Sequence, residues 1–120
     1  MKKNILIIDD EMNICTSLTF ALEDHYNVMS TTNPREGLNL LKEHPFEIVL
    51  LDLKIGKING LDLLKDIKKI DNNIIVIMMT AYGSIDSAIT AIKSGAFTYL
   101  TKPLNIEELI INIEKALEFK

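Results

Sequence analysis

The chain of 120 residues has little of several features, and each shortage excludes a class of protein. Its single cysteine, Cys15, cannot form a disulfide within the chain. We expect it to be a small buried core residue of a protein in a reducing compartment. No apolar run approaches the ~20 residues of a membrane span, and the short apolar run after the basic start ends in acids, unlike a signal peptide. These shortages predict a cytoplasmic chain with no membrane partner.

Positive charge is also scarce, with 13 Lys and Arg against 17 Asp and Glu and a net charge of −4 at pH 7. This balance argues against a basic surface, so we expect no direct nucleic acid binding by this chain. The apolar fraction of 48% and the charged fraction of 25% are typical of a globular domain. With 3 prolines, 5 glycines and no linker-like stretch, residues 1–120 are predicted to form one domain.

Short apolar runs alternate along the chain with segments of helical spacing. The runs are Ile5–Ile8, Ile48–Leu51 and Ile74–Met79, with weaker ones at Tyr26–Thr31 and Phe97–Leu100. Continuous apolarity is typical of parallel strands that are covered on both faces. Strict alternation of strands with helices predicts an α/β fold, a flavodoxin-like doubly wound (βα)5 domain. Its parallel five-stranded sheet is expected in the order 2-1-3-4-5, with helices on both faces.

Two of the helices carry specific expectations. The second opens with Asn33 as cap, Pro34 at the first position and Glu36 to close a capping box. The fourth starts near Ser84 and ends at Gly95, a residue suited to a left-handed cap. Its apolar residues, which repeat over positions 85–92, are predicted by their period to be mostly core. Any exposed remainder is a candidate dimer or effector surface.

Polar residues follow the strands where each strand ends. Asp9 and Asp10 follow the first run, Asp52 the third, Thr80 the fourth and Lys102 the fifth. In a sheet of this order the ligand crevice lies beyond the carboxyl ends of the strands, between the first and the third. We therefore expect the three aspartates to converge there, with a hydroxyl and an ammonium group beside them.

Three clustered carboxylates repel one another, and a hard divalent cation with oxygen ligands relieves that repulsion. A site with a small number of protein ligands, whose coordination shell is completed by water, favours Mg²⁺. The lack of a His/Cys cluster disfavours zinc. A metal, Lys102 and Thr80 around a central carboxylate suit phosphoryl transfer. Asp52 is best placed as the nucleophile that forms an aspartyl phosphate, with Asp9 and Asp10 holding the metal and its waters.

Each of these residues also has a structural explanation. Asp52 can begin a turn, and the acids after the first strand can cap a helix. Thr80 can be a plain strand-end hydroxyl, and Lys102 before a proline can be extended chain. These explanations do not predict that all of the residues meet at one edge of the sheet, so we favour a joint site.

The segments "ILIIDDE", "VLLDLK…NGLDLL", "MMTAYGS" and "GAFTYLTKPL" together resemble the receiver domain of bacterial two-component response regulators. The resemblance covers essentially the whole chain, with the motifs in the family's order and spacing. The stretch "TAYGSIDSAITAIKSGAFTYLTKP" is most similar to receivers of the NtrC type, which precede AAA+ activators of sigma-54 transcription.

The resemblance implies a role for each residue of the acidic site. Asp52 would be the phosphoacceptor. Asp10 and Asp52 would bind Mg²⁺ directly, together with the backbone carbonyl of Lys54, and Asp9 would act through metal-bound water. One departure from the family pattern lies close by, because Gly56 stands where the family usually has proline. That departure bears on the stiffness of the loop after the acceptor.

The resemblance also implies a switch. Lys102 would pair with the phosphoryl group, and a cis peptide bond is expected before Pro103. Thr80 would move to bond a phosphoryl oxygen, and Tyr99 would be the coupled aromatic switch, turned inward on the fifth strand. Tyr82, two residues beyond Thr80, would bear on the lifetime of the phosphoryl group.

The implied partners are a sensor histidine kinase and a second copy of the chain. The copy would bind through the face of the fourth helix, the fifth strand and the fifth helix. We expect a longer parent chain with C-terminal AAA+ and DNA-binding domains and an output in transcription. The only activities expected of this chain itself are self-phosphorylation from small donors and self-dephosphorylation.

Three other functions compete. A Mg²⁺-dependent phosphatase of the haloacid dehalogenase type would need a second aspartate where Lys54 stands. A flavodoxin-like electron carrier would need a Gly/Ser/Thr loop for the FMN phosphate, but the first turn is acidic. A docking module that is never phosphorylated would not need Asp9, Asp10, Asp52, Thr80 and Lys102 together.

Overall fold

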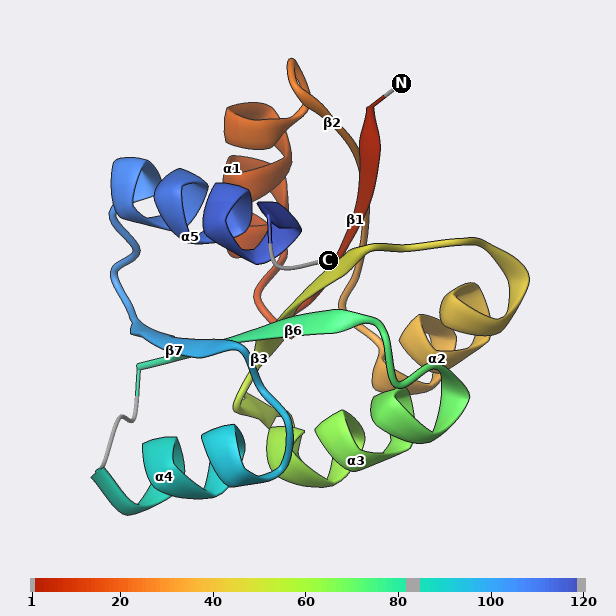
Figure 1. The fold of residues 1–120 in the computed structure, drawn as a ribbon, viewed down its shortest axis with the longest axis vertical. Helices are drawn as coiled ribbons and strands as arrows, with labels where there is room; N and C mark the ends of the chain where they lie inside the picture. The colour runs from red at the N-terminus through yellow and green to blue at the C-terminus, as the bar shows by residue number, and fades with distance from the viewer. Residues whose placement is uncertain (1, 82–84, 119–120) are drawn as a thin grey trace.

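The computed structural model describes residues 2–81 and 85–118 and contains one parallel sheet of five strands (Figure 1). The strand order is β2-β1-β3-β6-β7. Since β6 and β7 are the fourth and fifth strands of this sheet, the predicted order 2-1-3-4-5 is confirmed. The strands are β1 (Lys3–Ile8), β2 (Tyr26–Thr31), β3 (Ile48–Asp52), β6 (Ile75–Thr80) and β7 (Thr98–Thr101).

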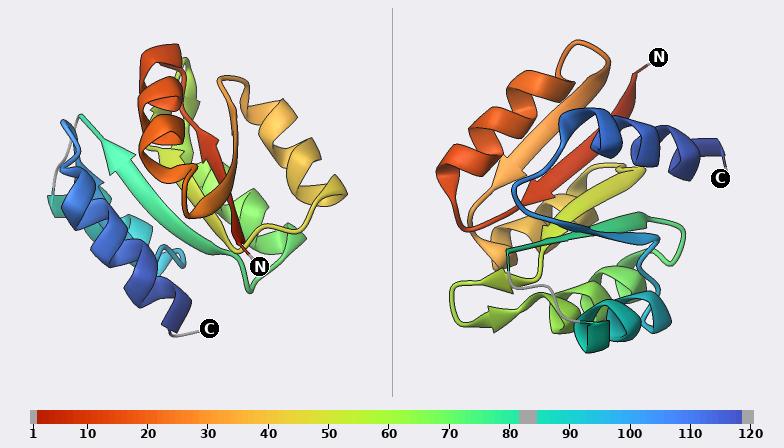
Figure 2. Two further views of the ribbon diagram at one scale, coloured as in Figure 1. Left: turned by 90° about the horizontal axis from the view of Figure 1, so that it is seen from above. Right: turned by 90° about the vertical axis from the view of Figure 1, so that its left-hand side faces the viewer.

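Helices cover both faces of the sheet, with α1 and α5 on one side and α2, α3 and α4 on the other (Figure 2). The helices are α1 (Met12–Leu22), α2 (Pro34–Glu43), α3 (Gly60–Ile70), α4 (Ile85–Lys93) and α5 (Ile106–Glu118). Successive strand residues point to opposite faces. In β1, Ile5 and Ile7 therefore pack under α1 and α5, while Leu6 and Ile8 pack under α2 and α3. This explains the continuous apolar runs within the central strands β1, β3 and β6.

The expected core role of Cys15 is confirmed, because its side chain is buried in α1 and its thiol is free. Within residues 2–81 and 85–118, no helix has both the length and the apolar character needed to cross a membrane.

The start of α2 is capped by Asn33, as predicted, but the expected capping box is not formed. The Asn33 side-chain oxygen accepts hydrogen bonds from the N–H groups of Arg35 (2.9 Å) and Glu36 (3.3 Å). The N–H of Asn33, which Glu36 was expected to bind, instead donates to Oγ1 of Thr31 at 3.0 Å. Thr31 ends β2 two residues earlier, so its hydroxyl reaches this donor first and leaves Glu36 exposed to solvent.

Replacing Asn33 with alanine should lower the free energy of unfolding by about 0.5–2 kcal/mol, because two N–H groups at the helix start lose their acceptor. Urea unfolding measures this loss. Asn39→Ala is the matched control, because Asn39 is exposed in the interior of the same helix. Equal stability of the two variants would contradict the capping role.

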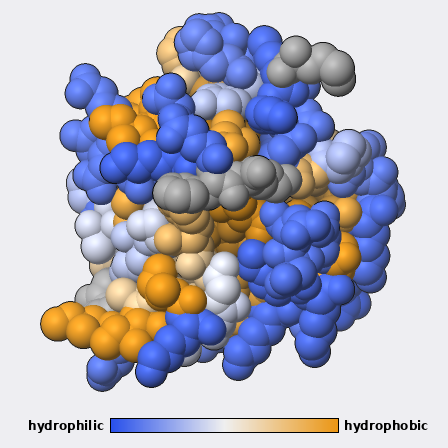
Figure 3. All heavy atoms as spheres, viewed as in Figure 1, coloured by the Kyte–Doolittle hydropathy of each residue, from blue (hydrophilic) through white to orange (hydrophobic). Residues whose placement is uncertain are grey.

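The prediction that the apolar residues of α4 are mostly core is wrong. Ile85, Ile89 and Ile92 are 80%, 46% and 48% exposed, whereas Ala91 is fully buried. At about 100° per residue, the three isoleucines form a stripe roughly 120° around the helix from Ala91. The small alanine face packs inward and the stripe is left in solvent, where hydrophobic atoms gather over α4 at the lower left of Figure 3.

The predicted start of α4 near Ser84 lies outside the described residues. Gly95 ends α4 with a positive φ of 109°, as expected.

A small antiparallel hairpin that the sequence reading did not predict follows β3. It consists of β4 (Lys54–Ile55) and β5 (Ile58–Asn59). Ile55 pairs with Ile58, so the loop contains only Gly56 and Lys57. Ile55 is buried and ties the hairpin to the core beside α3, which places its turn next to the end of β1.

Candidate functional site

The register of the sheet brings the polar strand ends to one edge. Ile8 pairs with Leu51, so Asp9 and Asp52 follow side by side on adjacent parallel strands. On the other side of β3, Thr80 pairs with Thr101, and Lys102 is the next residue. The predicted convergence of these residues at the carboxyl edge of the sheet is therefore what the fold produces.

Asp9, Asp10 and Asp52 form an acidic cluster. Each contributes a carboxylate oxygen, and these oxygens all lie within 4.8 Å of one another. Asp9 is fully buried and Asp52 is 5% exposed, whereas Asp10 is at the surface. Hard oxygen donors at this spacing, open to solvent on one side, fit a small divalent cation that keeps part of its water shell.

Lys102 provides the positive charge of the site. Its Nζ lies 2.7 Å from Oδ2 of Asp9, 3.5 Å from Oδ2 of Asp52 and 3.9 Å from Oε1 of Glu11. Burial alone would lower the pKa of Lys102, but the hydrogen bond to Asp9 and the nearby carboxylates outweigh it and raise that pKa. Lys102 therefore remains an ammonium group at neutral pH. The peptide bond between Lys102 and Pro103 is cis.

The carboxyl group of Asp52 has an unusual proton affinity. Burial raises its pKa to about 6, with the charge of Asp9 adding to the effect. Lys102 and the backbone N–H of Lys54 oppose this rise but do not cancel it. Burial disfavours the charged form of this carboxylate, so a bound cation, or conversion to a group whose charge is better neutralised by its neighbours, would stabilise the site.

The raised pKa of Asp52 predicts a pH-dependent stability. The folded state binds this proton more tightly than the unfolded chain, whose ordinary value is 3.8. The stabilisation is therefore complete below pH 3.8 and is lost as the pH rises through about 6. We expect the free energy of unfolding of the metal-free protein, measured with urea, to contain a decline across this window that Asp52→Asn removes. An identical decline in both proteins would show that Asp52 is not its source.

Helix capping does not account for the acids after β1. Glu11 is the residue at the cap position of α1, and its side chain makes no capping hydrogen bond. Asp9 accepts the N–H of Glu11 through Oδ1 at 2.9 Å, but its other oxygen is directed to Lys102. The acids therefore serve the cluster more than the helix.

Thr80 and Tyr99 lie on neighbouring strands behind the cluster. Thr80 is fully buried at the end of β6. Tyr99 in β7 is half-buried, and its ring packs against the core on the side of α3 and α4. The Tyr99 hydroxyl oxygen is buried and has no hydrogen-bond partner among the described residues. The tyrosine is thus turned inward, while Tyr82 lies outside the described residues.

Sequence reasoning gave Gly60 no role near the site and named Gly56 only as a departure from the family pattern. Gly60 begins α3 directly behind β3, and its N–H donates to the carbonyl of Leu53 at 2.5 Å. A Cβ at Gly60 would overlap the carbonyl oxygen of Asp52 and lie 2.8 Å from Cα of Leu53. The Asn-Gly pair before the helix was the available signal, because such glycines often mark a close backbone approach.

Replacing Gly60 with alanine should lower the free energy of unfolding by about 1–3 kcal/mol, because backbone rather than a flexible side chain must move. Gly37→Ala is the matched control. Its Cβ would meet the Cδ1 atom of Ile8, which can rotate away, and alanine favours the helix interior. Urea unfolding of both variants tests this, and a loss at Gly60 no greater than that at Gly37 would contradict it.

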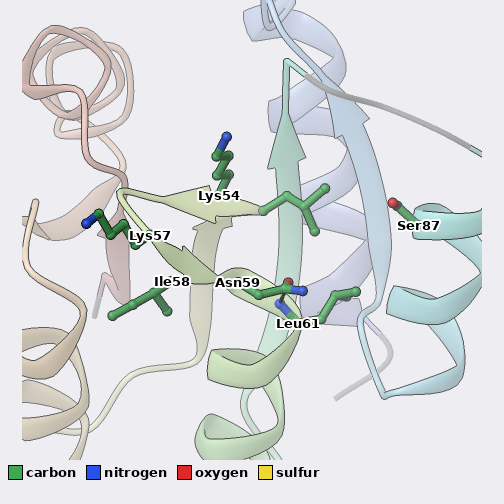
Figure 4. A pocket seen from close by; sticks show the side chains of 7 residues that line it. Lys54, Lys57, Ile58, Asn59, Leu61 and Ser87 are labelled. Atoms are coloured by element: carbon green, nitrogen blue, oxygen red, sulfur yellow. Dashed lines mark hydrogen bonds between the residues drawn. The ribbon is translucent and has the colours of Figure 1, made fainter.

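A cavity of about 370 Å³ lies beside the acidic cluster, between the β4–β5 hairpin and α4 (Figure 4). Its lining consists of Leu53, Lys54, Lys57, Ile58, Asn59, Leu61 and Ser87. In Figure 4, Ser87 faces the hairpin from α4 across this space. The cavity separates the hairpin side chains from that helix and includes none of the three aspartates.

Comparisons with known proteins agree with this geometry. The family model for the response regulator receiver domain matches residues 5–114. Transcriptional regulatory protein ZraR of Escherichia coli K12 is 39% identical over 115 residues, which cover 95% of this chain and 26% of ZraR. The chain thus spans about a quarter of that relative's length. Sporulation initiation phosphotransferase F of Bacillus subtilis is 36% identical over 121 residues, covering 100% of this chain and 98% of that protein.

Among solved structures, the beryllofluoride-activated NtrC4 receiver domain dimer superposes with a TM-score of 0.91. It is 34% identical, and the match covers 96% of each chain. The predicted similarity to receivers of the NtrC type is confirmed. By its matched family model, its fold and these relatives, the chain belongs to the response regulator receiver domain family.

Proposed function

We propose that residues 1–120 act as one receiver domain that accepts a phosphoryl group on Asp52 from a sensor histidine kinase. The observation that carries this proposal is the placement of the buried Asp52. Its carboxylate lies within 4.8 Å of those of Asp9 and Asp10 and 3.5 Å from the Lys102 ammonium group. The membership of the chain in the receiver family supports two-component signalling as the setting.

In the proposed reaction, a carboxylate oxygen of Asp52 attacks the phosphorus atom of the donor. The new O–P bond forms as the N–P bond of the kinase phosphohistidine breaks. The electron pair of that bond returns to the imidazole nitrogen, which takes a proton from solvent. Lys102 and Thr80 are the proposed donors to the phosphoryl oxygens, which carry the charge of the transition state.

Mg²⁺ is the proposed cofactor, because its hard charge neutralises the carboxylates and the phosphoryl oxygens when it is bound. Asp10, Asp52 and the backbone carbonyl of Lys54 would hold it directly. Asp9 would hold it through water, since its Oδ2 already pairs with Lys102.

The proposed switch transmits the new charge to the face formed by α4, β7 and α5. An aspartyl phosphate carries roughly two negative charges and three acceptor oxygens, which gives Thr80 and Lys102 a new partner. Tyr99 would follow Thr80. The exposed stripe of Ile85, Ile89 and Ile92 supports a second copy of the chain as one reader of this face. The beryllofluoride-activated NtrC4 receiver domain is a dimer, which supports the same proposal.

The output is proposed from the relatives. ZraR is a transcriptional regulatory protein about four times as long as the matched segment, which supports a longer parent with AAA+ and DNA-binding domains. We propose a cytoplasmic location, with neither membrane nor nucleic acid bound by this chain itself. The proposed activities of the chain are self-phosphorylation and self-dephosphorylation. Lys54, in place of a second aspartate, favours a switch over a phosphatase that turns over external substrates.

The test is the intact mass of the chain after incubation with acetyl phosphate, with Mg²⁺ and with the metal chelated. We expect one added phosphoryl group that depends on the metal. An unchanged mass with acetyl phosphate, other small donors and a kinase would favour the docking module. Continuous release of phosphate from external phosphate esters would instead favour the phosphatase.

A further inference from the structure

The two-residue turn of the β4–β5 hairpin lies against the acidic cluster. Gly56, its first residue, has a φ of 61°, and no other residue type has a positive φ in the part of the chain that the structure describes. A hairpin loop in which only the first of two residues has positive φ corresponds to a type II′ turn, which places glycine at that position. The backbone conformation of the turn therefore requires glycine at position 56, whether or not this residue contributes to the acidic cluster.

The N–H of Gly56 donates a hydrogen bond of 2.9 Å to Oδ2 of Asp10, which is 46 residues away in the sequence. In residues 2–81 and 85–118, this is the one hydrogen bond or ion pair found for the Asp10 carboxylate. Asp9 and Asp52, by contrast, are held by burial and by Lys102. Asp10 thus depends on the hairpin for its orientation.

Electrostatics explains why such a support matters. Asp10 is exposed, and the like charges of Asp9 and Asp52 repel its carboxylate toward solvent. A hydrogen bond from an N–H group to a charged oxygen is strong and directional, and it keeps this carboxylate within 4.8 Å of the other two. A carboxylate oxygen has two lone pairs, so it can accept the hydrogen bond from this N–H and bind a cation at the same time.

We infer that Gly56 is a positioning residue for the magnesium site, whose backbone N–H orients Asp10 toward the cation. This inference rests on the proposed function, which includes that site. Groups that hydrogen-bond a metal-binding carboxylate tune its affinity although they never touch the metal. The cavity separates the side chains of the hairpin from α4 (Figure 4). The hydrogen bond itself, with the buried Ile55, sets the position of the turn.

Binding of Mg²⁺ and ordering of the turn are coupled in this arrangement. If the oriented Asp10 favours the cation, the bound cation equally favours the state in which Asp10 accepts the Gly56 N–H. Amide hydrogen exchange at Gly56 is then slower in the presence of Mg²⁺ than in its absence. A competing role, in which the cation displaces the turn from Asp10, would make this exchange faster.

The experiment is a Mg²⁺ titration of the whole chain, followed by backbone amide NMR shifts, for the natural sequence and Gly56→Pro. Proline has no N–H and holds φ near −65°, so both the donor and the turn are lost. We expect the dissociation constant for Mg²⁺ to rise about 10-fold or more. Ile58→Ser is the matched control, because it changes an exposed residue of the same hairpin and keeps the Gly56 N–H, and its dissociation constant should not change.

An unchanged Mg²⁺ affinity in a folded Gly56→Pro variant would overturn the inference, as would an equal loss in Ile58→Ser. If Gly56→Pro does not fold, exchange at the Gly56 amide of the natural chain decides. Slower exchange with Mg²⁺ supports the inference, and unchanged or faster exchange overturns it. Failure of the natural chain to bind Mg²⁺ would instead contradict the proposed function.

Discussion

Replacing Asp52 with asparagine is expected to abolish uptake of a phosphoryl group while leaving the chain folded. The amide has nearly the shape of the carboxylate but lacks its nucleophilic charge. The variant should also be more stable than the natural chain at pH 7 without metal, because the raised pKa of about 6 shows that the charge of Asp52 is disfavoured there. The intact mass after treatment with acetyl phosphate and Mg²⁺, together with urea unfolding, measures both effects.

Asp66→Asn is the control for this substitution. Asp66 is an exposed aspartate of α3 outside the acidic cluster, so the variant should take up one phosphoryl group as the natural chain does. Uptake that persists in Asp52→Asn would place the acceptor elsewhere and return Asp52 to the role of a strand-end turn residue.

Replacing Lys102 with methionine is expected to produce the second large effect, a loss of stability at neutral pH. Lys102 is 9% exposed and pairs with Asp9, which is not exposed at all. Removing the cation leaves buried carboxylates unpaired, a change that typically costs about 3–5 kcal/mol. Part of the loss should be regained at pH 5, where Asp52 with its pKa of about 6 is protonated, and part on addition of Mg²⁺.

Urea unfolding of Lys102→Met at pH 7 and pH 5, with and without Mg²⁺, measures this prediction. Lys65→Met removes an exposed lysine of α3 and should change stability little under any of these conditions. A Lys102→Met variant as stable as the natural chain at pH 7 would show that the ion pair with Asp9 does not hold the cluster together.

The sheet and the convergence of the site could be predicted because both follow from short-range rules. Strands buried on both faces contain continuous apolar runs, as in Ile48–Leu51 of β3, and strict alternation with helices leaves few topologies. Once the order is fixed, the carboxyl ends of β1 and β3 must lie side by side. The meeting of Asp9 and Asp52 then follows from sequence position alone.

Other features depend on which of two residues wins a place in the core or a hydrogen-bond donor, and the sequence pattern does not show this. In α4 both the alanines and the isoleucines recur with helical spacing, and only packing against the sheet decides that Ala91 faces inward. At α2, Glu36 satisfies the capping pattern, but Thr31 reaches the same donor from the preceding strand. The contact between Gly56 and Asp10 joins a backbone donor to a side chain 46 residues away, which side-chain patterns cannot reveal.

Identification of the modified residue tests the central claim most directly. The chain is treated with acetyl phosphate and Mg²⁺ and then with borohydride, which reduces an aspartyl phosphate to homoserine. Peptide mass spectrometry locates the change. Homoserine at position 52, and at neither Asp9 nor Asp10, is the predicted result. Homoserine at another aspartate, or at none after a range of donors and a kinase, would contradict the account.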